Sequence, residues 1–152
     1  MCKQYTRPMA DSTTLLEKCL YFTANALARN ITRMAEDSFA PAGLTPSQAF
    51  MLMLVLESPG VTPSELAASL HLAPSTVTRL ADSLLRKGLV ERTASGKTAH
   101  YSPTQAAHDA RPTIDRCWKS LHQAYSALLG EADGDALSHS LLCAGRLLEP
   151  PR

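Results

Sequence analysis

The 152-residue sequence lacks long hydrophobic runs and closely spaced cysteines, and each absence excludes a class of protein. Its longest apolar run, FMLMLVL at residues 50–56, is too short to cross a bilayer. The first residues, MCKQYTRPMADS, contain no apolar segment of the signal-peptide type. No C-x-x-C pair occurs among Cys2, Cys19, Cys117 and Cys143, which argues against a disulfide scaffold or a structural zinc site. We therefore expect a cytoplasmic protein with no membrane partner.

Motifs of catalysis and of metal binding are also absent from the sequence. There is no Ser/His/Asp order, no phosphate-binding glycine loop and no pair of carboxylates suited to acid–base catalysis. The five histidines show no metal-ligand spacing, and GEADGD at 130–135 lacks the glutamate and the spacing of a calcium loop. We predict no enzyme activity, no cofactor and no metal. A zinc site from His108 with His122 or Cys19 would require the fold to assemble it.

The composition is that of a globular protein with little net charge. Apolar residues make up 45% of the chain, and its length fits one domain or a small core with extensions. The net charge of +1 neither requires nor excludes a nucleic-acid partner, because a binding surface needs only local positive charge.

Long helices are expected at both ends of the chain. Apolar residues at three- and four-residue steps predict one helix over 14–39, which the following APAG ends. SPTQ at 102–105 has the form of a capping box that opens a second helical region reaching about Leu129. Pro112 lies inside that region and should kink or split it. GEADGD at 130–135 predicts a break, followed by a last helix with Leu137, Leu141, Ala144 and Leu148 on its apolar side.

The middle of the chain predicts three short helices and a hairpin. TPSQ at 45–48 and TPSE at 62–65 are capping boxes with proline at the first helical position. The helices expected in this part lie at 47–57, 63–70 and 74–87. The last one ends at Gly88, and two strands around a turn at Ser95–Gly96 follow it.

The helix expected at 74–87 has an apolar stripe on one side and hydroxyl and arginine side chains on the other. It is the second helix of a pair and precedes a hairpin, as in a winged helix-turn-helix, whose second helix enters the DNA major groove. Serine and threonine can bond bases or phosphates, and arginine suits guanine or phosphate. The alternative is an ordinary solvated face. The polar side holds Ser75, Arg79, Asp82 and Arg86, with Thr76, Thr78 and Ser83 beside them.

Two further features support the DNA-binding interpretation. The helix begins after Ala73, which offers no side-chain acceptor, so its first N–H groups are available to a phosphate or, as the alternative, to water. The hairpin adds Arg92 and Lys97. Between Ser75 and Lys97 the chain has five basic and two acidic residues, which is enough local charge for phosphate contacts in a dimer.

At this point the sequence resembles a known family. The segment GLTPSQAFMLMLVLESPGVTPSELAASLHLAPSTVTRLADSLLRKGLVER contains GLT-x-x-Q, ELA, STVTR and L-x-x-KGLVER, in the order and spacing of the multiple-antibiotic-resistance regulator (MarR) family. The resemblance covers about residues 25–104. It implies an obligate homodimer in which each recognition helix reads half of a pseudo-palindromic operator. It also implies base or phosphate contacts from Ser75, Thr76, Thr78 and Arg79, and phosphate contacts from Thr62, Pro63 and Ser64.

The resemblance and the helix order together predict a mainly α (α+β) fold. Its parts are an N-terminal dimerisation helix (1–40), a winged helix-turn-helix DNA-binding domain (41–104) and C-terminal dimerisation helices (105–152). The terminal helices carry more apolar surface than a monomer of this size easily covers, which also favours a homodimer.

Two departures from the family pattern concern the wing and the helix after it. Where the family usually has Asp-x-Arg in the wing, this chain has Ser95-Gly96-Lys97. Lysine lacks the guanidinium fork and favours a narrow minor groove less, so weaker wing readout is expected. The family's Leu-Thr-x-x-Gly appears as PTQAA at 103–107, which leaves the start of the next helix open.

The family resemblance also implies a sensing function, in which a small anionic aromatic or lipophilic effector, or an oxidised cysteine, releases a repressor from DNA. Cys19 lies near the reactive thiol of peroxide-sensing relatives, and the alternative is a buried, inert cysteine. Trp118 and Tyr125 are candidate walls of a ligand pocket, or plain core. Cys117 and Cys143 are expected in the core. A winged-helix adaptor that binds proteins and not DNA remains the second functional class.

Overall fold

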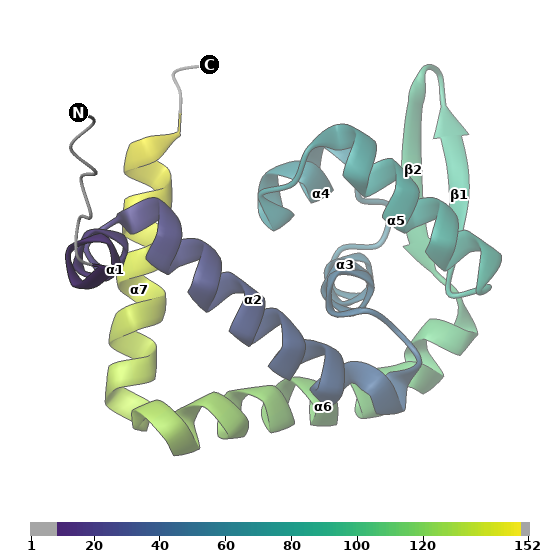
Figure 1. Cartoon of the computed structure of the whole chain (residues 1–152). Coiled ribbons are helices and arrows are strands. Elements are labelled where there is room, and N and C mark those ends of the chain that lie inside the picture. Colours follow the sequence, from purple (N-terminus) through teal and green to yellow (C-terminus); the bar gives the residue numbers. More distant parts are fainter. Residues whose placement is uncertain (1–8, 150–152) are drawn as a thin grey trace, which may run out of the picture.

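The computed structural model describes residues 9–149, which contain seven α-helices, one 3₁₀ turn and one antiparallel hairpin (Figure 1). In chain order they are α1 (Met9–Glu17), α2 (Leu20–Phe39), η1 (Ala40–Ala42), α3 (Pro46–Glu57), α4 (Pro63–Leu70), α5 (Pro74–Arg86), β1 (Val90–Ser95), β2 (Thr98–Pro103), α6 (Gln105–Leu129) and α7 (Glu131–Leu148). This arrangement confirms the predicted mainly α fold with a winged helix-turn-helix core.

The elements form two groups that meet along α2 and α6. Figure 1 shows α3, α4, α5 and the hairpin together on one side, with α1, α2, α6 and α7 extending to the other. The two strands pair in register from Val90 opposite Pro103 to Ser95 opposite Thr98. A bridge between Val61 and Tyr101 joins the base of the hairpin to the loop between α3 and α4.

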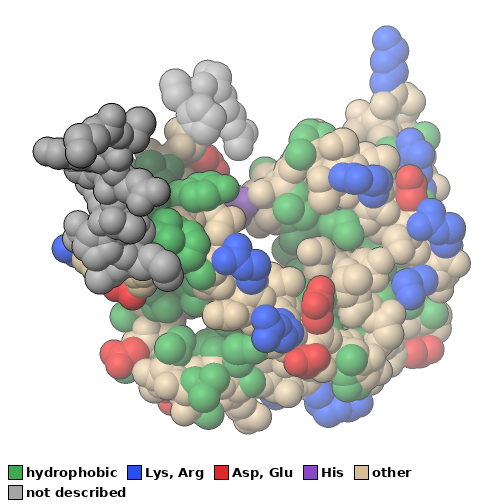
Figure 2. Space-filling view, in the orientation of Figure 1, with side chains coloured by type: hydrophobic (Ala, Val, Ile, Leu, Met, Phe, Trp, Pro, Cys, Tyr) green, Lys and Arg blue, Asp and Glu red, His purple; other side chains and the backbone are tan. Residues whose placement is uncertain are grey.

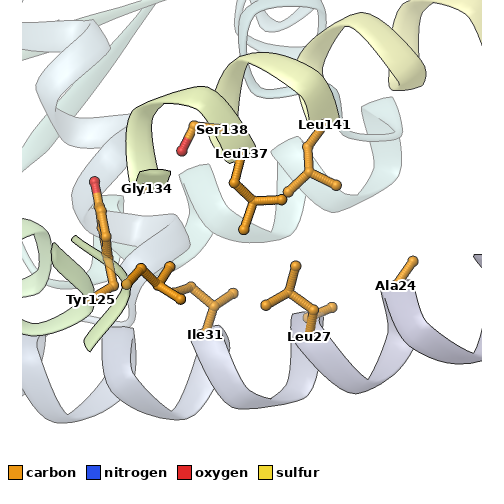
Figure 3. Close-up of a pocket in the computed structure, with 10 residues that line it drawn as sticks. Ala24, Leu27, Ile31, Tyr125, Gly134, Leu137, Ser138 and Leu141 are labelled. Atoms are coloured by element: carbon orange, nitrogen blue, oxygen red, sulfur yellow. The ribbon is translucent and has the colours of Figure 1, made fainter. Parts of the chain in front are cut away.

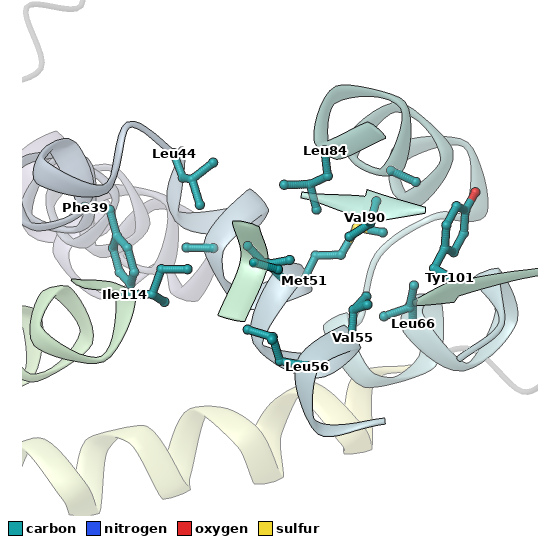
Figure 4. Packing of buried hydrophobic residues seen from close by; sticks show 14 of the residues in the cluster. Phe39, Leu44, Met51, Val55, Leu56, Leu66, Leu84, Val90, Tyr101 and Ile114 are labelled. Atoms are coloured by element: carbon teal, nitrogen blue, oxygen red, sulfur yellow. The ribbon is translucent and has the colours of Figure 1, made fainter. Parts of the chain in front are cut away.

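Helix α3 is the centre of the hydrophobic core. Its sequence is apolar on all sides, as expected for a helix that neighbours cover completely, and it contacts α2, α4, α5, α6 and β2. Side chains from these elements converge around it in Figure 4. The buried residues of α3 are Ala49, Met51, Leu52, Val55 and Leu56.

No single helix among residues 9–149 is long and apolar enough to cross a membrane. Among these residues, Leu20–Ala42 and Pro46–Glu57 are long and apolar enough only when taken together, and the two segments are bent by 62° at the break between them. The second segment is α3, whose apolar character the core already explains.

Helix caps fix the boundaries of the short helices. The predicted capping boxes of Thr45 with Gln48 and of Thr62 with Glu65 are both present. The third predicted capping box, SPTQ at 102–105, is wrong, because Ser102 lies in β2 and Thr104 caps α6. The Thr104 hydroxyl accepts the Ala107 N–H (3.4 Å) and donates to the Gly88 carbonyl (2.7 Å), so it also ties α6 to the end of α5.

The predicted single helix over 14–39 is wrong, because the chain bends between α1 and α2. Cys19 has extended backbone angles, φ −88° and ψ 113°, and α2 begins at the next residue. Neither proline nor glycine marks this position, so apolar periodicity continues through a bend that it cannot reveal.

Three expectations about turns and breaks are also corrected. Of the kink or split expected at Pro112, the split is wrong, because Pro112 lies within a continuous α6. The break predicted at 130–135 is confined to Gly130, after which Glu131 and Asp133 occupy the first turn of α7, where the helix dipole favours carboxylates. The hairpin turn lies at 96–97, one residue later than expected, and Gly96 has φ 62° at the position that type II′ turns give to glycine.

Candidate nucleic-acid interface

Helix α5 buries one face and exposes the other, as its sequence predicts. Val77, Ala81 and Leu84 are fully buried in the core beside α3. The opposite side is polar, with Ser75, Thr78, Arg79 and Arg86 exposed and Thr76 half-buried. The predicted DNA-reading side chains therefore share one accessible surface.

Among the described residues, the side chains at the start of α5 form only local bonds. Thr78 Oγ1 donates to the Pro74 carbonyl at 3.1 Å, and Arg79 Nη2 reaches Thr76 Oγ1 at 3.5 Å. The second distance is long for a hydrogen bond. The Arg79 guanidinium thus keeps its donors for a partner outside the chain.

The uncapped start of α5 leaves a backbone donor free. Ala73 makes no side-chain cap bond, and its carbonyl accepts from the N–H groups of Thr76 (2.9 Å) and Val77 (3.1 Å). Pro74 has no N–H, so within residues 9–149 the Ser75 N–H is the donor of this turn without an acceptor. The phosphate contact expected here is therefore reduced to one amide group.

The start of α4 is occupied by its own cap. The Thr62 N–H and hydroxyl donate to Glu65 Oε2 at 2.8 and 2.7 Å. These two bonds hold the pKa of Glu65 below its ordinary value, and the charge of His100 adds a smaller effect. Of the three residues predicted to face phosphate here, Ser64 is exposed, whereas Thr62 and Pro63 are half-buried.

Positive charge collects on α5 and the hairpin. Figure 2 shows Lys and Arg side chains spread over this face, with one at the tip of the hairpin. Within the part of the chain described with side chains, none of the basic residues on this face forms an ion pair. They are Arg79, Arg86, Lys87, Arg92 and Lys97. Lys87 Nζ donates to the Gly43 carbonyl at 3.1 Å, so the other four are the freer cations.

The base of the wing is anchored and its tip is free. The Tyr101 N–H donates to the Val61 carbonyl at 2.9 Å, and the Gly60 N–H donates to the Tyr101 carbonyl at 2.8 Å. His100 Nδ1 also lies 2.9 Å from the Gly60 carbonyl. Arg92 lies on β1 opposite Tyr101, Lys97 lies in the turn beyond this anchor, and both are exposed.

The candidate sensor residues fall in different places. Cys19 is exposed in the single chain, at the bend between α1 and α2. Cys117 is buried as expected, but Cys143 is exposed on α7, 3.5 Å from His139 Nε2. Cys2 lies outside the described residues. Among residues the structure describes, no group of three or more His, Cys, Asp or Glu could hold a metal ion.

One pocket lies between α2, α6 and α7 (Figure 3). It has a volume of about 320 Å³ and is lined largely by apolar side chains, including Leu27, Ile31 and Leu141. Tyr125 lines this pocket, whereas Trp118 does not and is 45% exposed. The structure thus separates the two residues predicted to form a pocket wall.

Gln48 is a residue whose part in this interface the sequence did not reveal. Its capping position was evident from TPSQ, but its Nε2 also donates to Ser83 Oγ on α5 at 2.8 Å. The two residues are 35 positions apart, so no local pattern joins them.

An exposed basic second helix, a supporting first helix and a two-stranded wing define the class of winged helix-turn-helix DNA-binding proteins. Residues 42–99 match the model of the MarR family. The winged-helix domain of this chain is therefore similar to that of the MarR family.

The sequence relatives are described as transcriptional regulators. The uncharacterized HTH-type transcriptional regulator YhbI of Bacillus subtilis is 27% identical over 129 residues, which is 84% of this chain and 83% of that protein. The transcriptional repressor MprA of Escherichia coli is 34% identical over 86 residues. That alignment spans 52% of this chain and 49% of MprA, about half of each.

Solved structures extend the similarity to the flanking helices. The transcriptional repressor CouR bound to p-coumaroyl-CoA is 26% identical to this chain, with a TM-score of 0.73. CouR bound to a 23-mer DNA duplex is 25% identical, with the same TM-score. Each match covers 86% of this chain and 94% of the CouR chain. The regulator MosR of M. tuberculosis in complex with DNA is 24% identical, with a TM-score of 0.76 over 86% of this chain and 96% of that one. The MosR match shows the fold alone.

Proposed function

We propose that the protein is a homodimeric transcriptional repressor that binds a pseudo-palindromic operator through α5 and releases it on binding an effector or on oxidation. The observation that carries this proposal is the exposed polar face of α5. Its hydroxyl and arginine side chains are accessible and free of acidic ion partners among the described residues. Such a face suits the major groove.

Each part of the interface has a separate task in this proposal. Arg79 and the hydroxyls of Ser75, Thr76 and Thr78 contact bases or adjacent phosphates. The Ser75 N–H adds a backbone donor to phosphate. The surrounding phosphates are contacted by Arg86 and by Arg92 and Lys97 of the wing. At the start of α4 the contact falls to the exposed Ser64, because both donors of Thr62 are used by Glu65 and Pro63 has no N–H.

Exposed apolar side chains support the homodimer. Large hydrophobic residues with more than a third of their surface in contact with water are confined, within the described residues, to α1, α2, α6 and α7. They are Leu15, Leu16, Leu20, Tyr21, Phe22, Trp118, Leu128, Leu129, Leu137, Leu141, Leu142, Leu147 and Leu148. A second copy that covers these helices removes this surface from water and places two α5 helices on one duplex. The division into residues 1–40, 41–104 and 105–152 follows this assignment.

The pocket between α2, α6 and α7 supports release by a ligand. Its apolar lining suits the lipophilic part of an effector, and Tyr125 contributes an aromatic side chain. The similarity to CouR, solved with p-coumaroyl-CoA, favours an aromatic or acyl compound. Cys19 is the candidate for release by oxidation, because it is exposed at the bend that connects α1 with α2.

A salt titration tests DNA binding. The full-length protein is mixed with a fluorescent duplex that it has itself selected from a random-sequence library, and affinity is followed by anisotropy. Log affinity should fall linearly with log salt, with a slope of about −0.9 for each phosphate contacted. A protein that selects no duplex even at low salt is not this regulator, and the protein-interaction adaptor becomes the better assignment.

A further inference from the structure

Two polar residues join the start of α3 to the C-terminal half of α5. The Gln48 Nε2 group donates to Ser83 Oγ at 2.8 Å, in a half-buried position. The Oε1 atom of the same amide accepts the Thr45 N–H at 3.1 Å. Both ends of the Gln48 amide are therefore occupied, and its orientation is fixed.

Ser83 belongs to a row of α5 residues that includes the main candidate for base contact. Ser75, Arg79, Ser83 and Lys87 follow one another at four-residue steps, so they lie along one side of the helix. Ser83 bonds Gln48, and Lys87 bonds the Gly43 carbonyl at 3.1 Å. The segment 43–48 thus holds the C-terminal half of this row, while the half with Ser75 and Arg79 projects outward.

Apolar packing decides which side of α5 faces the core, and a directional bond can refine that rotation further. The buried stripe of Val77, Ala81 and Leu84 is attracted to the core, but this attraction has no preferred direction. A hydrogen bond has a preferred distance and angle. Because binding sites require side chains placed within about 0.5 Å, a directional bond one turn from Arg79 affects where the guanidinium points.

We infer that Gln48 is a positioning residue for DNA reading, because its bond to Ser83 refines the rotation of α5 without contacting DNA. The inference rests on the proposed function, since it assigns Gln48 a role in the same interface. Residues 43–48 directly follow α2 and η1 in the chain. The segment that bonds α5 is therefore continuous with α2.

Ser83→Ala in the full-length protein removes the acceptor and leaves the Gln48–Thr45 cap intact. Alanine is the better helix former, so helix propensity predicts no loss of stability. The dissociation constant for the duplex selected by wild type should rise about three- to tenfold, the effect of one lost hydrogen bond. Affinity for unrelated DNA and the salt slope should not change. Ser120→Ala, at an exposed position of α6, is the matched control, and Ser83→Thr, which keeps the hydroxyl, should retain wild-type affinity.

A double-mutant cycle separates positioning from direct contact. If Gln48 acts through Ser83, the variant with both Gln48→Met and Ser83→Ala binds no more weakly than Gln48→Met alone. If Ser83 itself touches DNA, the two losses add and the inference is overturned. Unchanged affinity in Ser83→Ala also overturns it.

Hydrogen exchange tests the same bond without DNA. Amides of α5 should exchange faster in Gln48→Met and Ser83→Ala than in wild type, with α6 unchanged. If wild type selects no duplex, the proposed function and the DNA-reading role fall together. The exchange rates of the α5 amides then still test whether the Gln48–Ser83 bond holds this helix. Unchanged rates in both variants would refute that claim too.

Discussion

Arg79 is the residue on which the DNA assignment depends most. It lies exposed on α5, and among the described residues its guanidinium has one hydrogen bond, the long contact to Thr76. Its planar fork can contact guanine O6 and N7 or a phosphate.

Replacement of this arginine should weaken operator binding. Arg79→Ala is expected to cost about 1–3 kcal/mol of binding free energy for the selected duplex while leaving the dimer intact. Fluorescence anisotropy and size-exclusion chromatography measure the two effects. Arg116→Ala removes an exposed arginine of α6 and should change neither; equal affinities of the Arg79 variant and wild type would refute the assignment of this face.

Glu65 gives a pH-dependent contribution to the stability of the winged-helix domain. The Thr62 N–H, followed by the Thr62 hydroxyl, lowers the Glu65 pKa below 4.5, its ordinary value, against a smaller opposing effect of burial. Because the folded-state pKa is the lower one, the stabilisation is complete above the unfolded-state value. It is lost as pH falls through the folded-state pKa.

The comparison of wild type with Glu65→Gln isolates this contribution. An amide oxygen can still accept from Thr62, as Gln48 accepts from Thr45, but it does not titrate. From about pH 6 to about pH 3 the Tm of wild type should therefore fall more than that of the variant. Thermal unfolding followed by circular dichroism measures both; parallel curves would show that the capping carboxylate adds no pH dependence.

At the scale of elements, Gly130 controls the angle between α6 and α7. It has φ 88° and ψ 143°, a combination that essentially only glycine adopts. A side chain at this position strains the backbone whatever space surrounds it.

The two glycines near α7 should respond oppositely to alanine. Gly130→Ala is expected to destabilise the fold by about 1–3 kcal/mol. Gly145→Ala, inside α7 with nothing within 4 Å of an added Cβ in this chain, should stabilise it by about 0.5–1 kcal/mol. Urea unfolding gives both values, and shifts of the same sign would contradict the strain assigned to Gly130.

The elements also show which parts of the structure are readable from sequence. Capping boxes predict α3 and α4, and the apolar stripe and Gly88 predict α5, because these signals lie within a few residues of the helix ends. The bend at Cys19 carries no such residue. GEADGD predicts a longer break than the structure has, because acidic residues suit the first turn of a helix as well as a loop.

The candidate site divides in the same way. The exposed face of α5 follows from helical periodicity, which is local. The Gln48–Ser83 bond, the Thr104 contact with Gly88 and the pocket between α2, α6 and α7 join distant segments. Tertiary packing creates these contacts, and local patterns in a single sequence do not predict which distant segments pack together.

At the scale of the whole molecule, the apolar surface of the long helices predicts self-association. Leu128 is 77% exposed on α6, in the surface assigned to the second copy. Leu128→Glu places a charge in that interface, and desolvating an unpaired charge opposes association.

This substitution should convert dimer to monomer at concentrations where wild type is dimeric. Light scattering after size-exclusion chromatography measures the mass. Ala68→Glu, at an exposed position of α4, adds the same charge outside the interface and should leave the dimer intact. A Leu128→Glu variant that stays dimeric would place the interface elsewhere.

The central claim is that two copies of α5, fixed in one dimer, read two half-sites of one duplex. Half-sites for such a dimer lie about one helical turn apart, roughly 10–10.5 base pairs. The direct measurement is the affinity of the full-length protein for its selected duplex and for the same duplex with about five base pairs, half a turn, inserted between the half-sites. The account predicts that the insertion reduces binding to the level of unrelated DNA. Equal affinity for the two duplexes, or selected sequences without paired half-sites, would contradict it.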